Sequence, residues 1–218
     1  MNNRDYKKFH TGGIFHIYNR GNNKEKIFFE NQDYRAFLFR LGLGLGFSQE
    51  ELSLNKFLAM PYSRIRITVA EKSNFKLHAF ALMPNHFHLL IEQTGRETVS
   101  KLIAKVCTSY AKYINLKYKR VGHIFQDKFK AVLIQNHPQL IWTSAYIHMN
   151  PVKDRIVRNP EEYLWSSYPD YVCERNLPIT TKSFLTSVFG GKENFEKETL
   201  NFSTKEADPI VSKTVFDS

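Results

Sequence analysis

The sequence predicts an α+β protein, a ferredoxin-like or RRM-like sandwich whose mostly antiparallel sheet carries helices packed on one face. The first reason is the order of hydrophobic patterns, which runs strand, helix, strand, strand, helix, strand, helix. The second reason is a turn at Pro84 and Asn85 between two apolar runs, which is typical of a β-hairpin. The third is a long apolar stripe at helical spacing that begins at Leu102, after the hairpin.

The first strand is expected at residues 14–18, where β-branched and aromatic residues precede a turn rich in asparagine. Asn31 or Asp33 is placed to cap the first helix, whose apolar stripe continues to Leu41. A short helix is expected near Ser48, and residues 64–69 alternate like a further strand.

The hairpin is expected to join residues 75–82 to residues 86–92, and Thr98 or Ser100 then caps the long helix. Its apolar positions recur at the spacing of one helical face as far as Tyr118.

The last part of the pattern begins with a strand at residues 129–134 and continues into a helix with Pro138 near its first turn. Pro151 is expected to end or kink that helix because proline lacks a backbone donor. A small helix is expected near residues 184–189, and the polar stretch 199–218 is expected to be mobile.

Composition indicates a folded globular protein that favours polyanions. The 218 residues are 42% hydrophobic and 24% charged, but 31 Lys and Arg against 21 Asp and Glu give a net charge of +10. A protein surface with this excess of positive charge favours the binding of nucleic acid. No run approaches the roughly 18 apolar residues of a membrane span. Two cysteines make no disulfide framework, so we expect a cytoplasmic protein with no membrane partner.

His86 and His88 stand on either side of Phe87 in the second strand of the hairpin. Residues i and i+2 of a strand project from the same face, so both imidazoles point one way and Phe87 points the other. A structural zinc site needs more ligands than this pair. Two interpretations stay open: histidines satisfied by backbone and water, or ligands of a catalytic metal with open positions.

Tyr146, Asn150 and Lys153 are spaced to share one face of the predicted helix if helical geometry persists that far. Tyrosine can be a covalent nucleophile, but its ordinary pKa of about 10 requires an adjacent cation or a polarised target at neutral pH. A divalent cation could polarise a phosphate, with the amide oxygen of Asn150 among its ligands. The alternative is that Tyr146, one of 11 tyrosines, is an ordinary core aromatic.

A basic segment extends from Lys101 to Lys130, with eight basic residues against a single acid, Asp127. Aromatic residues are interleaved with these charges. Basic groups neutralise phosphates and aromatic rings can stack on unpaired bases, although packing in the core also explains many of the aromatics. The charge excess favours a nucleic-acid surface.

Five segments, in this order along the chain, resemble the single-tyrosine HUH transposases, whose domain is the IS200-like transposase domain. The resemblance is closest to the branch called REP-associated tyrosine transposases. The segments are residues 16–21 (HIYNRG), 78–90 (HAFALMPNHFHLL), 122–130 (GHIFQDKFK), 146–153 (YIHMNPVK) and 163–168 (YLWSSY).

The resemblance implies an enzyme that cleaves and rejoins DNA strands. In this family a tyrosine attacks a phosphodiester of single-stranded or hairpin DNA, leaving a 5′-phosphotyrosine link and a free 3′-OH. By position, Tyr146 matches the nucleophile, and His86, His88 and Asn150 match the ligands of Mg²⁺ or Mn²⁺. The resemblance also implies a bacterial, nucleoid-associated protein that acts as a monomer or homodimer.

The same resemblance, taken with the basic segment, supplies candidate DNA contacts. These are Arg20, Lys112, Lys119, Arg120, His123, Gln126, Lys128, Lys130 and Lys153. Asp127 stands where the family often carries a small residue, so its carboxylate is expected to weaken or redirect a phosphate contact.

The expected organisation is one HUH transposase domain over residues 1–172 and a C-terminal extension over residues 173–218, partly helical and then mobile. Residues 47–73 are longer than the usual link between the first helix and the hairpin, so we interpret them as an insertion.

Two other functions stay open. A domesticated relative would bind hairpin DNA or RNA without cutting it, although a pure binder has no need of His86, His88, Tyr146 and Asn150 together. A rolling-circle replication initiator or relaxase shares the two-histidine strand. Such proteins usually carry a larger additional domain or a third histidine near the pair, and no histidine lies between His88 and His123.

Overall fold

In the described part of the chain, four strands form one antiparallel sheet in the order β2-β3-β1-β4. The computed structural model describes residues 9–60, 65, 71–72 and 74–204. The strands are β1 (Ile14–Arg20), β2 (Phe75–Met83), β3 (His86–Gln93) and β4 (Lys130–Leu133). This sheet, with a helix after β1 and another after β3, confirms the predicted α+β class.

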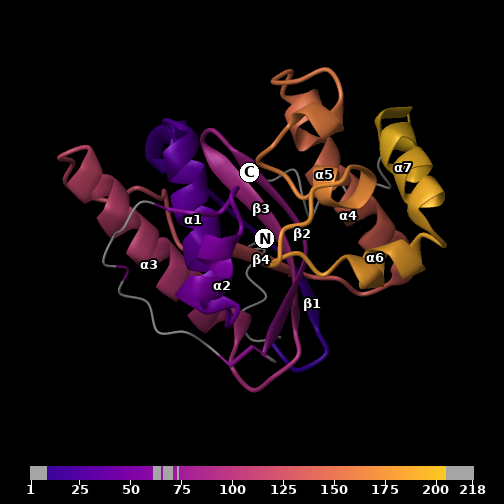
Figure 1. The fold of residues 1–218 in the computed structure, drawn as a ribbon, viewed down its shortest axis with the longest axis horizontal. Coiled ribbons are helices and arrows are strands. Elements are labelled where there is room, and N and C mark those ends of the chain that lie inside the picture. Colours follow the sequence, from indigo (N-terminus) through magenta and orange to yellow (C-terminus); the bar gives the residue numbers. More distant parts are fainter. Residues whose placement is uncertain (1–8, 61–64, 66–70, 73, 205–218) are drawn as a thin grey trace.

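Helices cover both faces of the sheet (Figure 1). One face carries α1 (Asn31–Gly44), α2 (Gln49–Leu54) and α3 (Val99–Lys117). The other carries α4 (His137–Lys153), α5 (Tyr168–Val172), α6 (Lys182–Val188) and α7 (Lys192–Leu200). Short 3₁₀ helices lie in the connections as η2 (Asn22–Lys24), η3 (Pro160–Glu162) and η4 (Asn201–Thr204). The expected single helical layer is therefore corrected to two layers.

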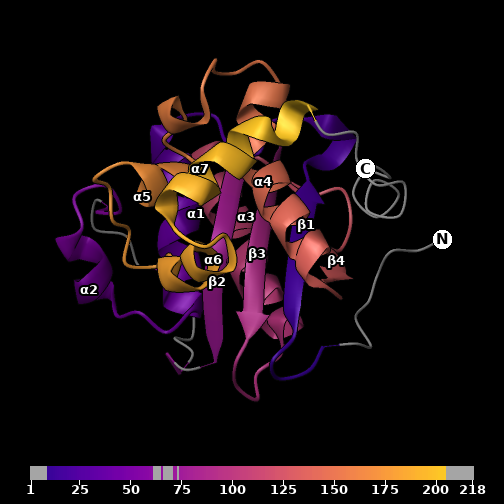
Figure 2. The same ribbon diagram turned by 90° about the vertical axis from the view of Figure 1, so that its right-hand side faces the viewer.

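The second layer exists because β3, inside the sheet, is apolar on both sides. Phe87, Leu89 and Ile91 are buried in the core that includes α1 and α3. Leu90 belongs to a separate core that includes α4 and α7. In that second core Ala79 of β2 is fully buried, and its small side chain lets a helix approach the sheet closely. Figure 2 shows α4, α6 and α7 lying over this face.

Two local predictions concern the ends of helices. α4 continues through Pro151 to Lys153, since the missing proline donor affects only its last turn. The first residues of the stretch 199–218, which is expected to be mobile, lie in α7 and η4. Thr199 is buried, and the ring of Phe202 lies 5.3 Å from that of Trp142. The rest of the expected mobile tail, residues 205–218, lies outside the described residues, as does most of the expected strand at 64–69.

The segment that follows α4 forms hydrogen bonds with both β2 and α4. The backbone N–H of Phe80 donates to the hydroxyl of Ser167 (2.8 Å), and Ser167 N–H donates to the Phe80 carbonyl (2.9 Å). His148 of α4 places its Nε2 2.8 Å from the same Ser167 hydroxyl. Nearby, Leu82 N–H donates to the Trp165 carbonyl (2.9 Å). Ser167 therefore fixes the position of α4 relative to the sheet.

Replacing Ser167 with alanine should destabilise the protein by about 2 kcal/mol or more, because Phe80 N–H and His148 Nε2 would both lose a buried partner. Urea unfolding of Ser167→Ala measures this loss. Ser187→Ala is the matched control, since Ser187 is exposed on α6 and its loss should change stability by about 0.5 kcal/mol or less. Equal stability of the two variants would contradict the role of the Ser167 hydrogen bonds in holding α4 against the sheet.

Candidate metal and nucleophile site

The histidine face of β3 forms the floor of a small cavity. His86 and His88 project from one face, as the strand period predicts, while Phe87 enters the opposite core. β1 runs alongside, with Tyr18 paired to His88 and Arg20 paired to His86. The cavity has a volume of about 170 Å³. Its lining residues are Tyr18, Asn19, Arg20, His86, His88, Tyr146, Asn150, Lys153 and Asp154.

α4 crosses this face and presents Tyr146, Asn150 and Lys153 to the cavity, so the three share a face as their spacing predicts. The Tyr146 ring stands edge-on to the His88 ring at a centroid distance of 5.4 Å. Trp142, one turn earlier on α4, stacks on Tyr146 at 5.2 Å. Lys153 Nζ lies 5.4 Å from the centre of the Tyr146 ring. The helix thus brings an aromatic hydroxyl and a cation to the histidine pair.

Hydrogen bonds orient His86 so that one ring nitrogen faces α4. Asn85 donates its amide N–H to the Lys24 carbonyl (3.1 Å), which turns its amide oxygen toward His86 Nδ1 (2.6 Å). His86 Nδ1 therefore carries the proton and donates it, leaving a lone pair on Nε2. That Nε2 lies 3.4 Å from Asn150 Oδ1, so two acceptor atoms face each other. A cation between these two atoms would accept a lone pair from each of them.

His88 is oriented by His16, a residue of β1 that the sequence did not predict for the site. His16 Nε2 lies 2.9 Å from His88 Nδ1, and the two rings stack at 5.1 Å. If His88 donates from Nδ1, its Nε2 lone pair is available in the same way as that of His86. A metal-ligating histidine commonly donates its second ring nitrogen to such a partner.

Burial keeps the three histidines neutral. It lowers the pKa of His16 to about 3 and lowers the pKa of His86 and, more strongly, that of His88. The neutral form is the one that binds metal ions. Burial also raises the pKa of Tyr146, while a hydrogen bond with Asn150 favours its phenolate. The environment therefore suits metal binding, and the phenolate needs further positive charge.

Two imidazole nitrogens and one amide oxygen form a donor set that fits Mn²⁺ comfortably, while Mg²⁺ prefers oxygen. Asn150 Oδ1 faces His86 Nε2 at 3.4 Å, so the amide presents its oxygen to this side of the cavity. No cluster of three or more His, Cys, Asp and Glu side chains in the described residues could hold a metal. The amide of Asn150 is thus needed to complete this site.

The sequence also missed Tyr18, Asn19 and Asp154, which line the cavity. Tyr18 and His16 alternate along β1 with Arg20, and that alternation is a visible signal that they share a face. Their proximity to β3, however, depends on strand pairing between residues 72 positions apart, such as His16 and His88.

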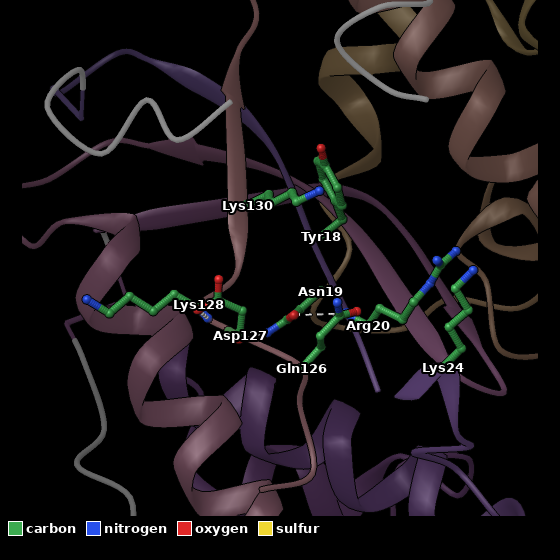
Figure 3. A pocket seen from close by; sticks show the side chains of 8 residues that line it. All are labelled: Tyr18, Asn19, Arg20, Lys24, Gln126, Asp127, Lys128 and Lys130. Carbon is green, nitrogen blue, oxygen red and sulfur yellow. Dashed lines mark hydrogen bonds between the residues drawn. The ribbon is translucent and has the colours of Figure 1, made fainter. Parts of the chain in front are cut away.

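The candidate DNA contacts divide into two groups. Arg20 and Lys153 line the cavity with the histidines, and Arg20 also lines a neighbouring cavity of about 260 Å³ with Gln126, Lys128 and Lys130 (Figure 3). His123 lines an adjoining hollow that shares Gln126 and Lys128 with the 260 Å³ cavity. The remaining candidates line none of these cavities: Lys112 and Lys119 are exposed on and after α3, and Arg120 pairs with Glu25 at 3.2 Å. Asp127 lines the 260 Å³ cavity and accepts a hydrogen bond from the backbone of Lys128 (2.7 Å).

Two comparisons with known proteins agree with this fold. The model of the family "Transposase IS200 like" matches residues 51–150, which include His86, His88, Tyr146 and Asn150. A solved structure of a REP-associated tyrosine transposase bound to a REP hairpin superposes with a TM-score of 0.54 at 16% identity. The match covers 81% of this chain and 88% of the other. A search of curated proteins finds none that matches this sequence.

Residues 51–150 therefore match the IS200-like transposase model, and the predicted resemblance is confirmed. The fold resembles that of the REP-associated tyrosine transposase over most of the chain. In the described residues, no helix combines the length and the apolar character needed to cross a membrane.

Replacing His16 with phenylalanine should weaken Mn²⁺ binding by about 10- to 100-fold, because the ring is kept but the partner of His88 Nδ1 is lost. His16→Gln should recover part of the affinity, since an amide can accept the same hydrogen bond. Titration calorimetry with Mn²⁺ measures both variants. His137→Phe, at an exposed position on α4, is the control, and an unchanged affinity in His16→Phe would contradict this role.

Stability should decrease as the pH falls below 6.5. Burial lowers the pKa of His16 and of His148 to about 3, against 6.5 for the unfolded chain, so the unfolded state binds more protons in this window. Stability is then complete above pH 6.5 and is lost progressively toward pH 3. The two residues together should remove about 3 kcal/mol between pH 7.5 and 5.5. Urea unfolding at both pH values measures the loss, and equal or greater stability at pH 5.5 would show that these histidines are not buried in the neutral form.

Proposed function

We propose that this protein is a metal-dependent single-stranded DNA endonuclease and strand transferase that acts on hairpin DNA through a 5′-phosphotyrosine intermediate. The observation that carries the proposal is the meeting of β3 and α4 over one cavity. His86 Nε2 and Asn150 Oδ1, which are 64 positions apart, come within 3.4 Å, and Tyr146 stands beside them. A transposase domain over these residues supports the same chemistry.

Tyr146 would act as the nucleophile. Its phenolic oxygen would form a bond to the phosphorus of a phosphodiester, and the bond between phosphorus and the 3′ oxygen would break. The phenolic proton would be lost to solvent, and the 3′ oxygen would take up a proton as a free 3′-OH. Attack by a 3′-OH on the phosphotyrosine would reverse these changes and join two strands, so the reaction needs no nucleotide cofactor.

His86, His88 and Asn150 would hold Mg²⁺ or Mn²⁺. The bound cation would polarise the phosphate and neutralise part of its charge. Asn85 and His16 would keep the two imidazoles in the orientation that this requires.

Positive side chains would support the nucleophile and the substrate. The charge of Arg20 favours the phenolate of Tyr146, and Lys153 Nζ lies 5.4 Å from the Tyr146 ring. Trp142 stacks on the same ring at 5.2 Å. Together with the net charge of +10, these groups favour a polyanionic substrate.

Hairpin DNA is the proposed substrate because the REP-associated tyrosine transposase that shares this fold is bound to a REP hairpin. We also propose that the protein works as a monomer or homodimer in the bacterial cytoplasm, near the nucleoid.

Tyr146→Phe should abolish the covalent protein–DNA adduct that the wild-type protein forms with single-stranded hairpins in Mn²⁺, because the attacking oxygen is removed. Denaturing gel electrophoresis with labelled hairpins from the DNA that flanks the gene detects the adduct. Tyr118→Phe is the control, since the Tyr118 hydroxyl bonds to Asp33, away from the cavity (2.7 Å). An adduct in Tyr146→Phe would show that another residue is the nucleophile.

His86→Ala should abolish cleavage and leave hairpin affinity within about twofold, because the loss of one metal ligand removes chemistry rather than the basic surface. Gel cleavage assays and fluorescence anisotropy measure the two properties on the same DNA. Binding without cleavage by the wild-type protein in Mn²⁺ would instead favour the domesticated hairpin DNA or RNA binding protein.

A further inference from the structure

Trp142 lies one turn before Tyr146 on α4, and its indole stacks on the Tyr146 ring. The two ring planes are 7° apart, and the ring centres are 5.2 Å apart. Such an offset parallel arrangement is one of the two that aromatic pairs prefer. The spacing of four residues produces it, because side chains at i and i+4 lie one above the other on a helix. The stack therefore joins two rings of the same helix.

The other aromatic rings around Tyr146 meet it edge-on. The His88 ring is inclined to the Tyr146 ring by 88° and the His16 ring by 74°. Phe202 of η4 makes a similar contact at 67°. Within the described residues, Trp142 is the only aromatic side chain whose ring is parallel to that of Tyr146. The contact with Trp142 therefore sets the plane of the phenol ring, while the other rings touch it from the side.

Buried tyrosines elsewhere in this protein are held by their hydroxyl groups. The Tyr110 hydroxyl donates to a backbone carbonyl at 2.6 Å, and so do those of Tyr163 and Tyr171. Tyr146 differs, because its hydroxyl interacts with the side chain of Asn150, which is itself a proposed metal ligand. A hydroxyl that attacks phosphorus cannot stay bonded to a backbone carbonyl. Contacts with the ring must then position this tyrosine.

The indole of Trp142 is itself held by a later part of the chain. The Phe202 ring lies 5.3 Å from the Trp142 ring and is inclined to it by 64°. A tryptophan side chain is large and has only two rotatable bonds, so such packing costs little conformational entropy. Trp142 is thus a rigid support between Phe202 and Tyr146.

We propose that Trp142 is a positioning residue for the strand-cleavage reaction. Its indole fixes the ring plane of Tyr146 and so directs the phenolic oxygen toward the phosphate beside His86 and Asn150. An attacking atom must lie about 3–3.5 Å from the atom that it attacks, and a misplacement of about 1 Å can cost roughly 100-fold in rate. The inference rests on the proposed function for the identity of the nucleophile, and it adds a residue that acts through Tyr146 alone.

The first test needs neither DNA nor metal. In protein labelled with meta-fluorotyrosine, the fluorine NMR resonance that is missing from Tyr146→Phe belongs to Tyr146. Trp142→Leu should shift and broaden this resonance, because the shielding by the indole is lost and the phenol ring becomes mobile. Trp142→Phe should keep it narrow, since a phenyl ring can still stack. An unchanged Tyr146 resonance in Trp142→Leu would overturn the proposal.

The second test separates attack from binding. The rate of adduct formation is measured on denaturing gels with saturating hairpin DNA in Mn²⁺, and hairpin affinity is measured by fluorescence anisotropy. Trp142→Leu should form the adduct about 100-fold more slowly and bind the hairpin within about twofold of the wild-type affinity. Trp142→Phe should recover the rate to within about fivefold, because it restores a parallel ring.

Two results of the second test would contradict the positioning role. Equal rates in Trp142→Leu and Trp142→Phe would show that the parallel ring is not what matters. A weaker hairpin affinity with an unchanged rate in Trp142→Leu would show that Trp142 contacts the DNA instead.

Phe184→Leu on α6 is the matched control. Phe184 is also half-buried in the same helical layer, but its ring lies 4.5 Å from that of His78 and does not stack on Tyr146. This variant should keep the adduct rate and the Tyr146 resonance, and an equal loss of rate in Phe184→Leu and Trp142→Leu would overturn the proposal. If the wild-type protein forms no adduct, the proposed function fails, whereas the fluorine resonance still decides whether Trp142 fixes Tyr146.

Discussion

β3 is buried on both faces, and its two-residue alternation governs the arrangement of the whole protein. Phe87 enters the core with α1 and α3, while His86 and His88 face α4 across the cavity. A slip of one residue would place both imidazoles in the apolar core and the phenyl ring in the cavity. Because unpaired polar groups are costly to bury, the register of β3 is strongly specified. The packing that stabilises the sheet therefore also positions the site.

The site combines two opposing electrostatic requirements. Burial keeps His86 and His88 neutral, which suits a metal ion, but the same burial raises the pKa of Tyr146 and disfavours its phenolate. Arg20 and Asn150 act in the opposite direction on Tyr146. The proposed nucleophile would therefore depend on nearby cations, and Arg20 lines both neighbouring cavities.

Local sequence patterns predict the parts of this structure that depend on neighbouring residues. The hairpin at Pro84 and the shared face of Tyr146 and Asn150 follow from strand and helix periods. The role of His16 did not follow, since its contact with His88 depends on which strands pair. The second helical layer was predictable in principle, because β2 and β3 are near-continuous apolar runs, which indicate strands covered on both sides.

Through Ser167, the position of the proposed site depends on residues that lie after α4 in the sequence. Every residue proposed for the metal and the nucleophile precedes Asp154. The position of α4, however, depends on the hydrogen bond between His148 and Ser167. Phe195 of α7 packs against the same imidazole (5.5 Å). A shortened version that stops after α4 would contain all the chemistry and lack the contacts that place it. The smallest transferable unit of this scaffold therefore includes its later helices.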